Sequence, residues 1–278
     1  MMGRGDPKDK PSSYGASMTA TAEVSQAGIT RSLDRKVVLV TGGAKNLGGL
    51  ISRDLAAHGA SVAVHYHSAE TSSAADETVA AAIDSGAEAF ALEADLTKPA
   101  EVRRLFDETV GRLGSLYATV NTAGMAVGKP LADFSEAEYD AMMGINAKAA
   151  FFVMQEAARR MEDGGRILNV LTSLLAAYTP LYSLYAGSKA PVEHFTRALS
   201  KELLDRSISV NSIALGPMDT PFFWNAAHPG EADFVKSQAM HGQLTQPVDI
   251  IPWVRFLLTD GWWLNGQTVF INGGFTTR

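Results

Sequence analysis

Short apolar runs alternate with longer amphipathic stretches along most of this chain. The runs are KVVLV, SVAVHY, EAFALEA, LYATVN, RILNVLT, ISVNSIA and QTVFIN. Between the first two, Leu47, Ile51, Leu55 and His58 recur at helical spacing, and Gly59 follows as a helix stop signal. Strands that alternate with helices predict βαβ units, and therefore a parallel sheet covered by helices on both faces.

One doubly wound α/β domain of the Rossmann type, with a sheet of about seven strands, is the simplest interpretation. It is expected to span residues 34–278, because no composition shift or linker interrupts the alternating pattern there. Residues 1–33 are rich in Gly, Ser, Thr, Ala and Pro without sustained periodicity, which predicts a flexible leader.

Composition narrows the class of protein further. The net charge is -6, and acidic and basic residues are interspersed, so no basic surface for nucleic acid or anionic membranes is expected. The chain has no cysteine, which excludes disulfides and thiol catalysis. No run approaches the roughly 20 apolar residues that span a bilayer, and the polar first residues lack a signal core. We therefore expect a soluble, cytoplasmic protein.

A glycine-rich stretch, TGGAKNLGG, follows the first apolar run and precedes the first predicted helix. A strand that leads through glycines into a helix can cradle phosphate groups on backbone N–H groups. The alternative is an ordinary strand-to-helix turn. Asn46 stands where a third glycine would be usual, and Asn tolerates left-handed backbone conformations better than most residues do. We therefore expect the cradle to be altered rather than lost.

The end of the second run indicates which nucleotide binds. A site for NAD(H) would place an acidic residue there for the ribose hydroxyls, but no carboxylate occurs before Glu70. His65, His67 and Ser68 occupy this end, and Lys45 lies in the glycine-rich stretch. These side chains suit a 2′-phosphate and predict NADP(H). A metal site is not expected, because no third ligand accompanies the histidines.

These motifs resemble those of the short-chain dehydrogenase/reductase family over almost the whole chain, from about Leu33. TGxxxGxG is that family's cofactor loop, LEADLT resembles its adenine-holding turn, and VNTAG resembles its NNAG turn. SIALGPMDTPFF and NGQTVFINGG resemble later segments, with Leu215 in place of the usual proline. The resemblance implies cofactor contacts at Gly42, Asn46, Leu47, Asp95, Leu96, Asn121, Ala123, Gly124, Gly216, Met218 and Thr220.

The chemistry is expected at Tyr185 and Lys189, which lie in YAGSK. Residues four apart share one face of a helix, so the phenol and the ammonium can act on one substrate. A tyrosine has an ordinary pKa of about 10, and lowering it by roughly three units needs about 4 kcal/mol of differential stabilisation. A neighbouring lysine and a positive nicotinamide ring favour the phenolate. The family resemblance also gives both residues a place in cofactor binding.

The fifth run ends at Thr172, and a second hydroxyl residue, Ser173, follows it. Only one of the two is expected to face the substrate, because successive strand side chains point to opposite sides. Thr172 lies thirteen residues before Tyr185, the separation of the family's substrate-polarising serine, while Ser173 matches that serine in chemical identity. We rank Thr172 first. Asn146 matches the family's helix asparagine, whose backbone carbonyl holds a water linked to the lysine.

Taken together, the resemblance implies hydride transfer between NADP(H) and a carbonyl or alcohol, with a ketoreductase as the leading hypothesis. Residues 218–246 resemble a substrate lid, and Phe222, Phe223 and Trp224, with Tyr178 and Leu181, suggest an apolar or planar substrate such as a 3-oxoacyl compound or another ketone. Packing or a subunit contact is the alternative role for these aromatic residues.

Two other functions stay open. AKNLG, HYHS and the terminal INGGFTTR resemble pteridine reductases, although Thr172 stands where those enzymes have an aspartate. A non-catalytic NADP(H)-sensing protein is the alternative of another class. Helices around Asn146–Met161 and Tyr185–Leu204 resemble those through which family members dimerise and tetramerise, so a homodimer or homotetramer is expected.

Overall fold

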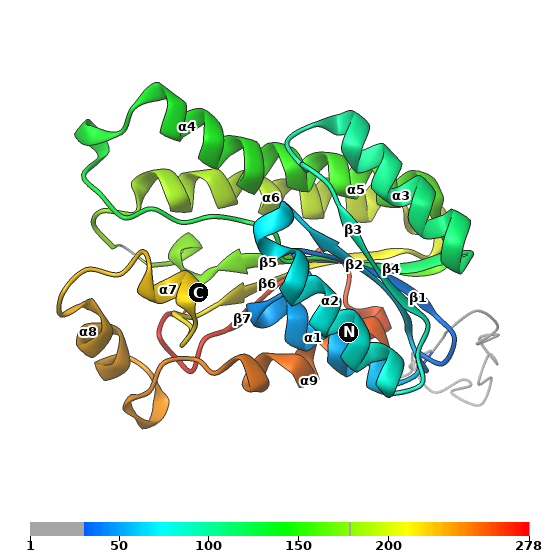
Figure 1. Ribbon diagram of the computed structural model, residues 1–278. Helices are drawn as coiled ribbons and strands as arrows, with labels where there is room; N and C mark the ends of the chain where they lie inside the picture. Colours follow the sequence, from blue (N-terminus) through cyan, green and yellow to red (C-terminus); the bar gives the residue numbers. More distant parts are fainter. Residues whose placement is uncertain (1–30, 178, 278) are drawn as a thin grey trace, which may run out of the picture.

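A computed structural model describes residues 31–177 and 179–277. Most of the predicted leader and Tyr178 therefore lie outside the described residues. Seven parallel strands form one sheet in the order β3-β2-β1-β4-β5-β6-β7, which confirms the predicted doubly wound fold (Figure 1). The strands are β1 (Val37–Thr41), β2 (Ser61–Tyr66), β3 (Ala89–Glu93), β4 (Leu116–Asn121), β5 (Met161–Thr172), β6 (Ser209–Leu215) and β7 (Thr268–Ile271).

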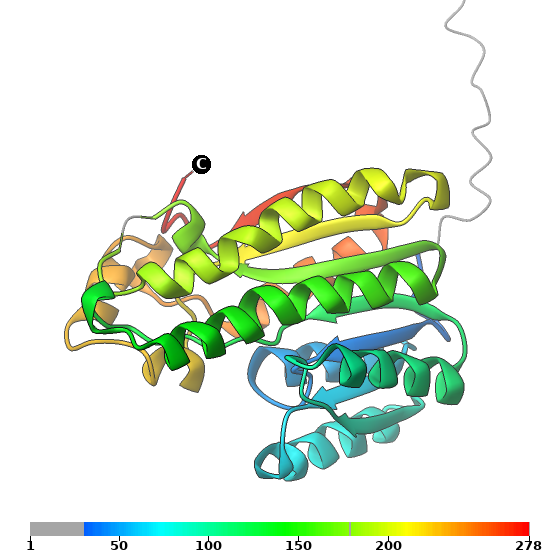
Figure 2. The same cartoon turned by 90° about the horizontal axis from the view of Figure 1, so that it is seen from above.

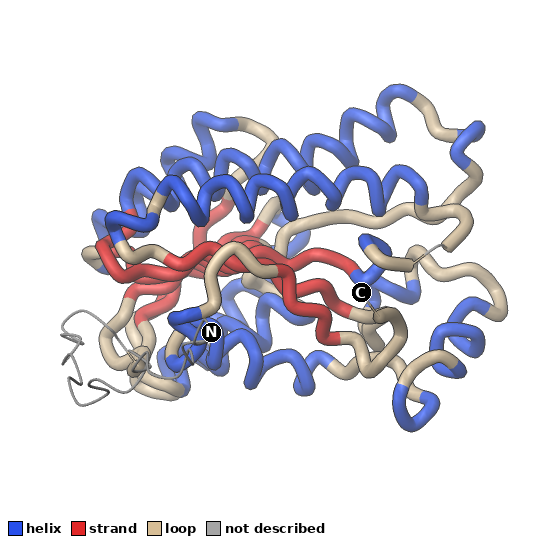
Figure 3. The backbone as a smooth tube through the Cα atoms, turned by 180° about the vertical axis from the view of Figure 1, so that it is seen from behind, coloured by secondary structure: helices blue, strands red, loops and turns tan. Residues whose placement is uncertain are grey.

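Helices cover both faces of this sheet, so that it forms the middle of three layers (Figures 2 and 3). The helices are α1 (Asn46–Ala57), α2 (Ser72–Asp84), α3 (Pro99–Leu113), α4 (Glu136–Met143), α5 (Ala149–Arg160), α6 (Ser183–Glu202), α7 (Pro221–Trp224), α8 (Glu231–Ser237) and α9 (Pro247–Leu258). Helices α1, α2 and α9 lie on one face, and α3, α4, α5 and α6 on the other (Figure 1). None that the described residues form is both long and apolar enough to cross a membrane.

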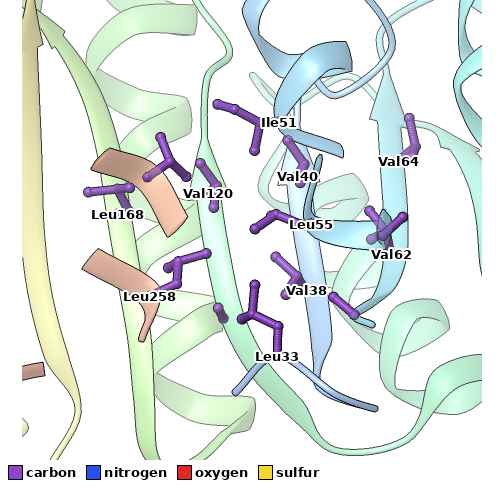
Figure 4. Packing of buried hydrophobic residues seen from close by; sticks show 14 of the residues in the cluster. Leu33, Val38, Val40, Ile51, Leu55, Val62, Val64, Val120, Leu168 and Leu258 are labelled. Carbon is purple, nitrogen blue, oxygen red and sulfur yellow. The ribbon is translucent and has the colours of Figure 1, made fainter. Parts of the chain in front are cut away.

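Strand β1 has no polar residue before Thr41, and its packing on both faces of the sheet explains this. Val38 and Val40 belong to the apolar cluster that includes Leu55 of α1 (Figure 4). The alternate residues Val37 and Leu39 belong to the cluster on the opposite face, which includes Phe106 of α3. Alternate side chains of a strand point to opposite faces, so a central strand buried on both faces has to be apolar throughout.

The strand order reverses between β1 and β4, whose neighbours β2 and β5 lie on opposite sides. In such sheets ligands bind beyond the carboxyl ends of the strands at this reversal. Helices α7 and α8 follow β6 and project beyond that edge, at the left of Figure 1. They fall inside the segment 218–246 that was expected to form a lid.

Candidate active site

A cavity of about 760 Å³ opens at the carboxyl ends of the strands. It runs from the glycine-rich turn and the ends of β2 and β3, past the ends of β4 and β5, to α6 and the α7–α8 segment. Seventeen predicted site residues line it. They are Gly42, Lys45, Asn46, Leu47, His65, His67, Asp95, Leu96, Ala123, Gly124, Thr172, Ser173, Tyr185, Lys189, Gly216, Met218 and Thr220.

The glycine-rich turn leaves no room for side chains at two positions. Gly42 has a φ of +66°, in the region that favours glycine. A Cβ atom on Gly48 would lie 2.1 Å from the carbonyl oxygen of Gly42, so even alanine there would displace the turn. The start of α1 is thereby packed directly against the turn, which brings its backbone N–H groups to the cavity.

Asn46 adopts the left-handed conformation that its residue type permits, with a φ of +51°. This is the conformation for which a glycine would be the usual choice, and it shows that the departure from the glycine pattern leaves the turn intact. Lys45 precedes it, is exposed at the cavity and forms no ion pair with any described residue. Its ammonium group is therefore available to an anion.

The end of β2 differs from the expectation in two respects. His65 is 2% exposed: the Gly42 N–H donates to its Nδ1 over 2.9 Å, and its Nε2 lies 2.9 Å from the carbonyl oxygen of Ala94. Burial lowers the pKa of His65 to about 4. A neutral imidazole with both nitrogens engaged cannot be the phosphate ligand that we expected. Ser68 does not line the cavity; Thr71 does, and its hydroxyl donates to the Ser68 carbonyl over 2.9 Å.

The turns after β3 and β4 are braced by their own side chains. The Asp95 carboxylate accepts from the N–H and the hydroxyl of Thr97 over 3.0 and 2.6 Å. Burial favours a higher pKa for Asp95, but these hydrogen bonds and Lys98 outweigh it and lower the pKa. Asn121 is buried, accepts from the Thr41 hydroxyl over 2.6 Å and does not line the cavity. It therefore braces the sheet behind the site instead of contacting a ligand there.

Tyr185 and Lys189 lie on one face of α6, as their spacing predicted. Lys189 is buried, and its Nζ donates to the carbonyl oxygen of Val170 over 3.1 Å. Burial lowers the pKa of Lys189 to about 8. Burial raises the pKa of Tyr185 to about 12, while a hydrogen bond with the Thr172 side chain acts in the opposite direction. At neutral pH the tyrosine is thus protonated, and the lysine beside it is still mostly in its charged form.

The two hydroxyls at the end of β5 have different partners. Thr172 meets Tyr185, and its oxygen also accepts from the Leu174 N–H over 3.2 Å. Ser173 is 1% exposed, accepts from the Asn272 side chain over 2.9 Å and lies 3.4 Å from the Ala214 carbonyl oxygen. The geometry therefore favours Thr172 over Ser173 as the group that meets a substrate oxygen.

Asn146 lies in a π-helical turn, Gly144–Lys148, between α4 and α5. Such single turns occur frequently at functional sites. Its side chain donates to the Met125 carbonyl over 2.8 Å and to the Ser188 hydroxyl over 2.9 Å. A Cβ atom on Gly124 would lie 2.8 Å from Asn146 Oδ1 and 3.0 Å from Lys189 Nζ. Asn146 does not line the cavity and holds the β4 turn against α6.

The far end of the cavity is aromatic. The Tyr185 ring lies 6.5 Å from that of Tyr182 and 6.3 Å from that of Phe222, between ring centroids. Phe223 and Phe275 also line this end. Two expectations were wrong: Leu181 does not line the cavity, and Trp224, 48% exposed, donates its indole N–H to Asp219.

A polar cluster fastens the α7–α8 segment over this aromatic end. The Tyr182 hydroxyl donates to the Ala226 carbonyl and lies 2.9 Å from the Glu231 carboxylate. The same carboxylate oxygen accepts from the His228 N–H, and the His228 ring lies 2.9 Å from the Gly128 carbonyl. The α7–α8 segment is thus held both to the start of α6 and to the loop after β4.

Sequence reasoning missed several residues that line the cavity. They are Thr71, Thr122, Met125, Tyr182, Glu231 and Phe275. Tyr182 could have been found, because it precedes Tyr185 by three residues, a spacing that places both on one side of a helix. Glu231 lies within the expected lid segment 218–246, but nothing in the local sequence singles out either Glu231 or Phe275 as a residue of the cavity. Across residues 31–177 and 179–277, no cluster of three His, Asp or Glu side chains could hold a metal ion.

A doubly wound sheet has a glycine turn after its first strand and, at the carboxyl ends of its strands, a half-buried tyrosine beside a buried lysine. These features together define a nucleotide-dependent oxidoreductase. The family model described as enoyl-(acyl carrier protein) reductase matches residues 42–276. The chain belongs to the short-chain dehydrogenase/reductase family, which confirms the resemblance seen in its motifs.

Similar proteins include enzymes of both bacteria and fungi. A dehydrogenase from Burkholderia cenocepacia, solved with bound NADP, is 51% identical, with a TM-score of 0.88 and coverage of 90% of this chain and 96% of that one. A blue fluorescent protein from a metagenomic library, in complex with NADPH, is 34% identical, with a TM-score of 0.84, and covers 88% of this chain and 100% of its own. A hydroxynaphthalene reductase-like protein of Metarhizium brunneum is 38% identical over 89% of this chain and 97% of its own length.

Proposed function

We propose that this protein is an NADP(H)-dependent ketoreductase that acts on an apolar or planar ketone. The observation that carries the proposal is the convergence of Thr172, Tyr185 and Lys189 at one cavity whose far end is lined by aromatic rings. A flat apolar substrate would stack there with its carbonyl oxygen at the two hydroxyls. The similarity to a hydroxynaphthalene reductase-like protein supports a planar substrate.

The residues at the other end of the cavity fit NADP(H). The glycine turn and the start of α1 offer backbone N–H groups to a pyrophosphate. Lys45 and His67 are exposed near the end of β2, where no carboxylate would repel a 2′-phosphate. The solved relatives that contain NADP or NADPH support this assignment. Asp95 and Leu96 would hold the adenine, and Met218 and Thr220 the nicotinamide end.

When bound, the nicotinamide supplies the hydride. The residues of this chain orient the ketone and donate the proton to its oxygen. Thr172 would donate a hydrogen bond to the ketone oxygen, and Tyr185, protonated because burial keeps its pKa near 12, would donate the proton that the oxygen needs. Lys189 would stabilise the resulting phenolate by its charge. The lid would exclude water from this end of the cavity.

The direct test is NADPH oxidation, with NADH as the control, across 3-oxoacyl esters, aromatic ketones, quinones and dihydrobiopterin. Wild type and Tyr185→Phe run side by side. We expect NADPH-dependent turnover of a planar ketone that falls by a factor of about 10²–10⁴ in the variant, the usual contribution of a positioned acid, while NADPH binding persists.

The other outcomes separate the alternatives. Preference for dihydrobiopterin would favour the pteridine reductase hypothesis. Tight NADPH binding without turnover of any of these substrates would favour a cofactor-sensing protein. A preference for NADH would contradict the assignment of Lys45 and His67 to a 2′-phosphate.

We also propose a homo-oligomer built on the outer faces of α5 and α6. Phe151 of α5 is 42% exposed, and its ring lies 5.3 Å from those of Phe152 and Phe195, the latter on α6. An aromatic cluster that spans two adjacent helices at the surface is the kind of apolar patch that protein interfaces cover.

A further inference from the structure

One buried imidazole joins the ends of three neighbouring strands. His65 belongs to β2, its Nδ1 accepts from the Gly42 N–H just beyond β1, and its Nε2 lies 2.9 Å from the Ala94 carbonyl oxygen just beyond β3. A carbonyl oxygen only accepts, so Nε2 carries the proton and Nδ1 is the acceptor. The ring is 2% exposed, and its pKa near 4 keeps it neutral in this tautomer at neutral pH.

The two partners of His65 lie at the two turns that would hold the adenosine half of the cofactor. Gly42 begins the glycine-rich turn and has a φ of +66°. Ala94 immediately precedes Asp95 and Leu96, which line the same cavity. A backbone hydrogen bond also links β2 to the glycine-rich turn: the Gly43 N–H donates to the His65 carbonyl over 2.9 Å.

We propose that His65 is a positioning residue for cofactor binding: its imidazole fixes the spacing between the glycine-rich turn and the turn after β3 before the dinucleotide arrives. The inference rests on NADP(H) as the proposed cofactor. A ligand that spans two turns binds more tightly when their spacing is already set, because less ordering has to occur on binding. His65 therefore acts through Gly42 and Ala94 and does not touch the phosphate.

The two nitrogens can be tested separately. In His65→Asn, the side-chain oxygen takes the place of Nδ1 and still accepts from Gly42. In His65→Gln, the amide nitrogen reaches the place of Nε2 and still donates to Ala94, but the Gly42 N–H is left without its acceptor. His65→Leu keeps the apolar volume and neither hydrogen bond. Tyr117→Phe is the matched control, because it removes a buried hydroxyl that donates to Leu258 at the opposite end of the sheet.

The measurements are the NADPH Kd by fluorescence titration and the Tm of the cofactor-free protein. We expect Tm to fall in all four variants, since each leaves a buried polar group unpaired. We expect the Kd to rise about tenfold in His65→Gln and His65→Leu, to stay within about threefold in His65→Asn, and not to change in Tyr117→Phe.

Equal Kd values in wild type and all His65 variants, with only Tm reduced, would overturn the proposal and leave His65 a residue of the core alone. Equal losses of affinity in His65→Asn and His65→Gln would also overturn the role given to the Gly42 hydrogen bond. A wild-type protein that does not bind NADPH would overturn this proposal and the proposed cofactor together.

Discussion

Asn46 has a left-handed backbone within a turn that otherwise relies on glycine. The conformation could be anticipated from the sequence, because Asn is one of the few residues that adopts it at low cost. The burial of His65 could not. Strand β2 lies between β3 and β1 and is covered on both faces, so its side chains do not alternate between apolar and polar. Nothing in the local sequence therefore indicates whether a polar residue at its end faces the cavity or the interior.

Substitution of Asn46 tests the conformational argument. Asn46→Val should reduce the free energy of unfolding by about 1–2 kcal/mol, because a β-branched residue is strained at positive φ. Asn46→Gly, which restores the common pattern, should stay within about 1 kcal/mol of wild type. Chemical denaturation measures both. If the valine variant is as stable as the glycine variant, the turn does not require a left-handed residue at this position.

The α7–α8 segment, the proposed lid, shows what the sequence conveys about an element and what it omits. Its place after the sixth strand followed from the order of the motifs. The side chains that face the cavity did not, because α7 is one turn long and too short for a helical period to identify its inner face. Phe222 and Phe223 line the cavity, whereas Trp224 is turned towards Asp219.

Removal of the Tyr182 hydroxyl should loosen this lid. In Tyr182→Phe, the hydroxyl that donates to the Ala226 carbonyl beside the Glu231 carboxylate is lost, a change worth about 1–3 kcal/mol when the acceptor stays buried. We expect amide hydrogen exchange in residues 221–237 to accelerate about tenfold or more, and KM for the ketone to rise while the Kd for NADPH is unchanged.

Tyr139→Phe is the control for this experiment, since Tyr139 is 51% exposed and its hydroxyl forms no hydrogen bond with any described residue. Exchange rates that are equal in the two variants would show that the polar cluster does not hold the lid closed.

At the scale of the whole molecule, the sequence predicted the layers and the number of strands because each buried strand is marked by its own apolar run. The sequence did not predict which distant segments contact one another. Glu231 and Phe275 reach the cavity only through the three-dimensional fold. Strand β5 begins at Met161, before the predicted run, and its register on β4 shifts between Leu116 and Ala118.

The proposed assembly can be tested through Phe151. Each chain has a mass of 29.6 kDa, and light scattering on a sizing column should give a multiple of this value for wild type. Phe151→Arg should shift the mass towards that of one chain, because it places a charge in the proposed apolar contact. Ile83→Arg, on α2 and also exposed, should leave the mass unchanged. A single-chain mass for wild type would contradict the oligomer.

The tail after β7 has a practical consequence for handling the protein. Asn272 donates to Ser173 and to Thr276, and Phe275 lines the cavity. The C-terminal end of the chain lies beside α7 in Figure 1. A purification tag, fluorescent fusion or solid support joined to this end would crowd the proposed substrate end of the cavity. Leu33 lies near the amino end of β1 (Figure 4), and the amino ends of the parallel strands are opposite the carboxyl ends at which the cavity opens. An attachment on that side keeps bulky cargo away from the chemistry.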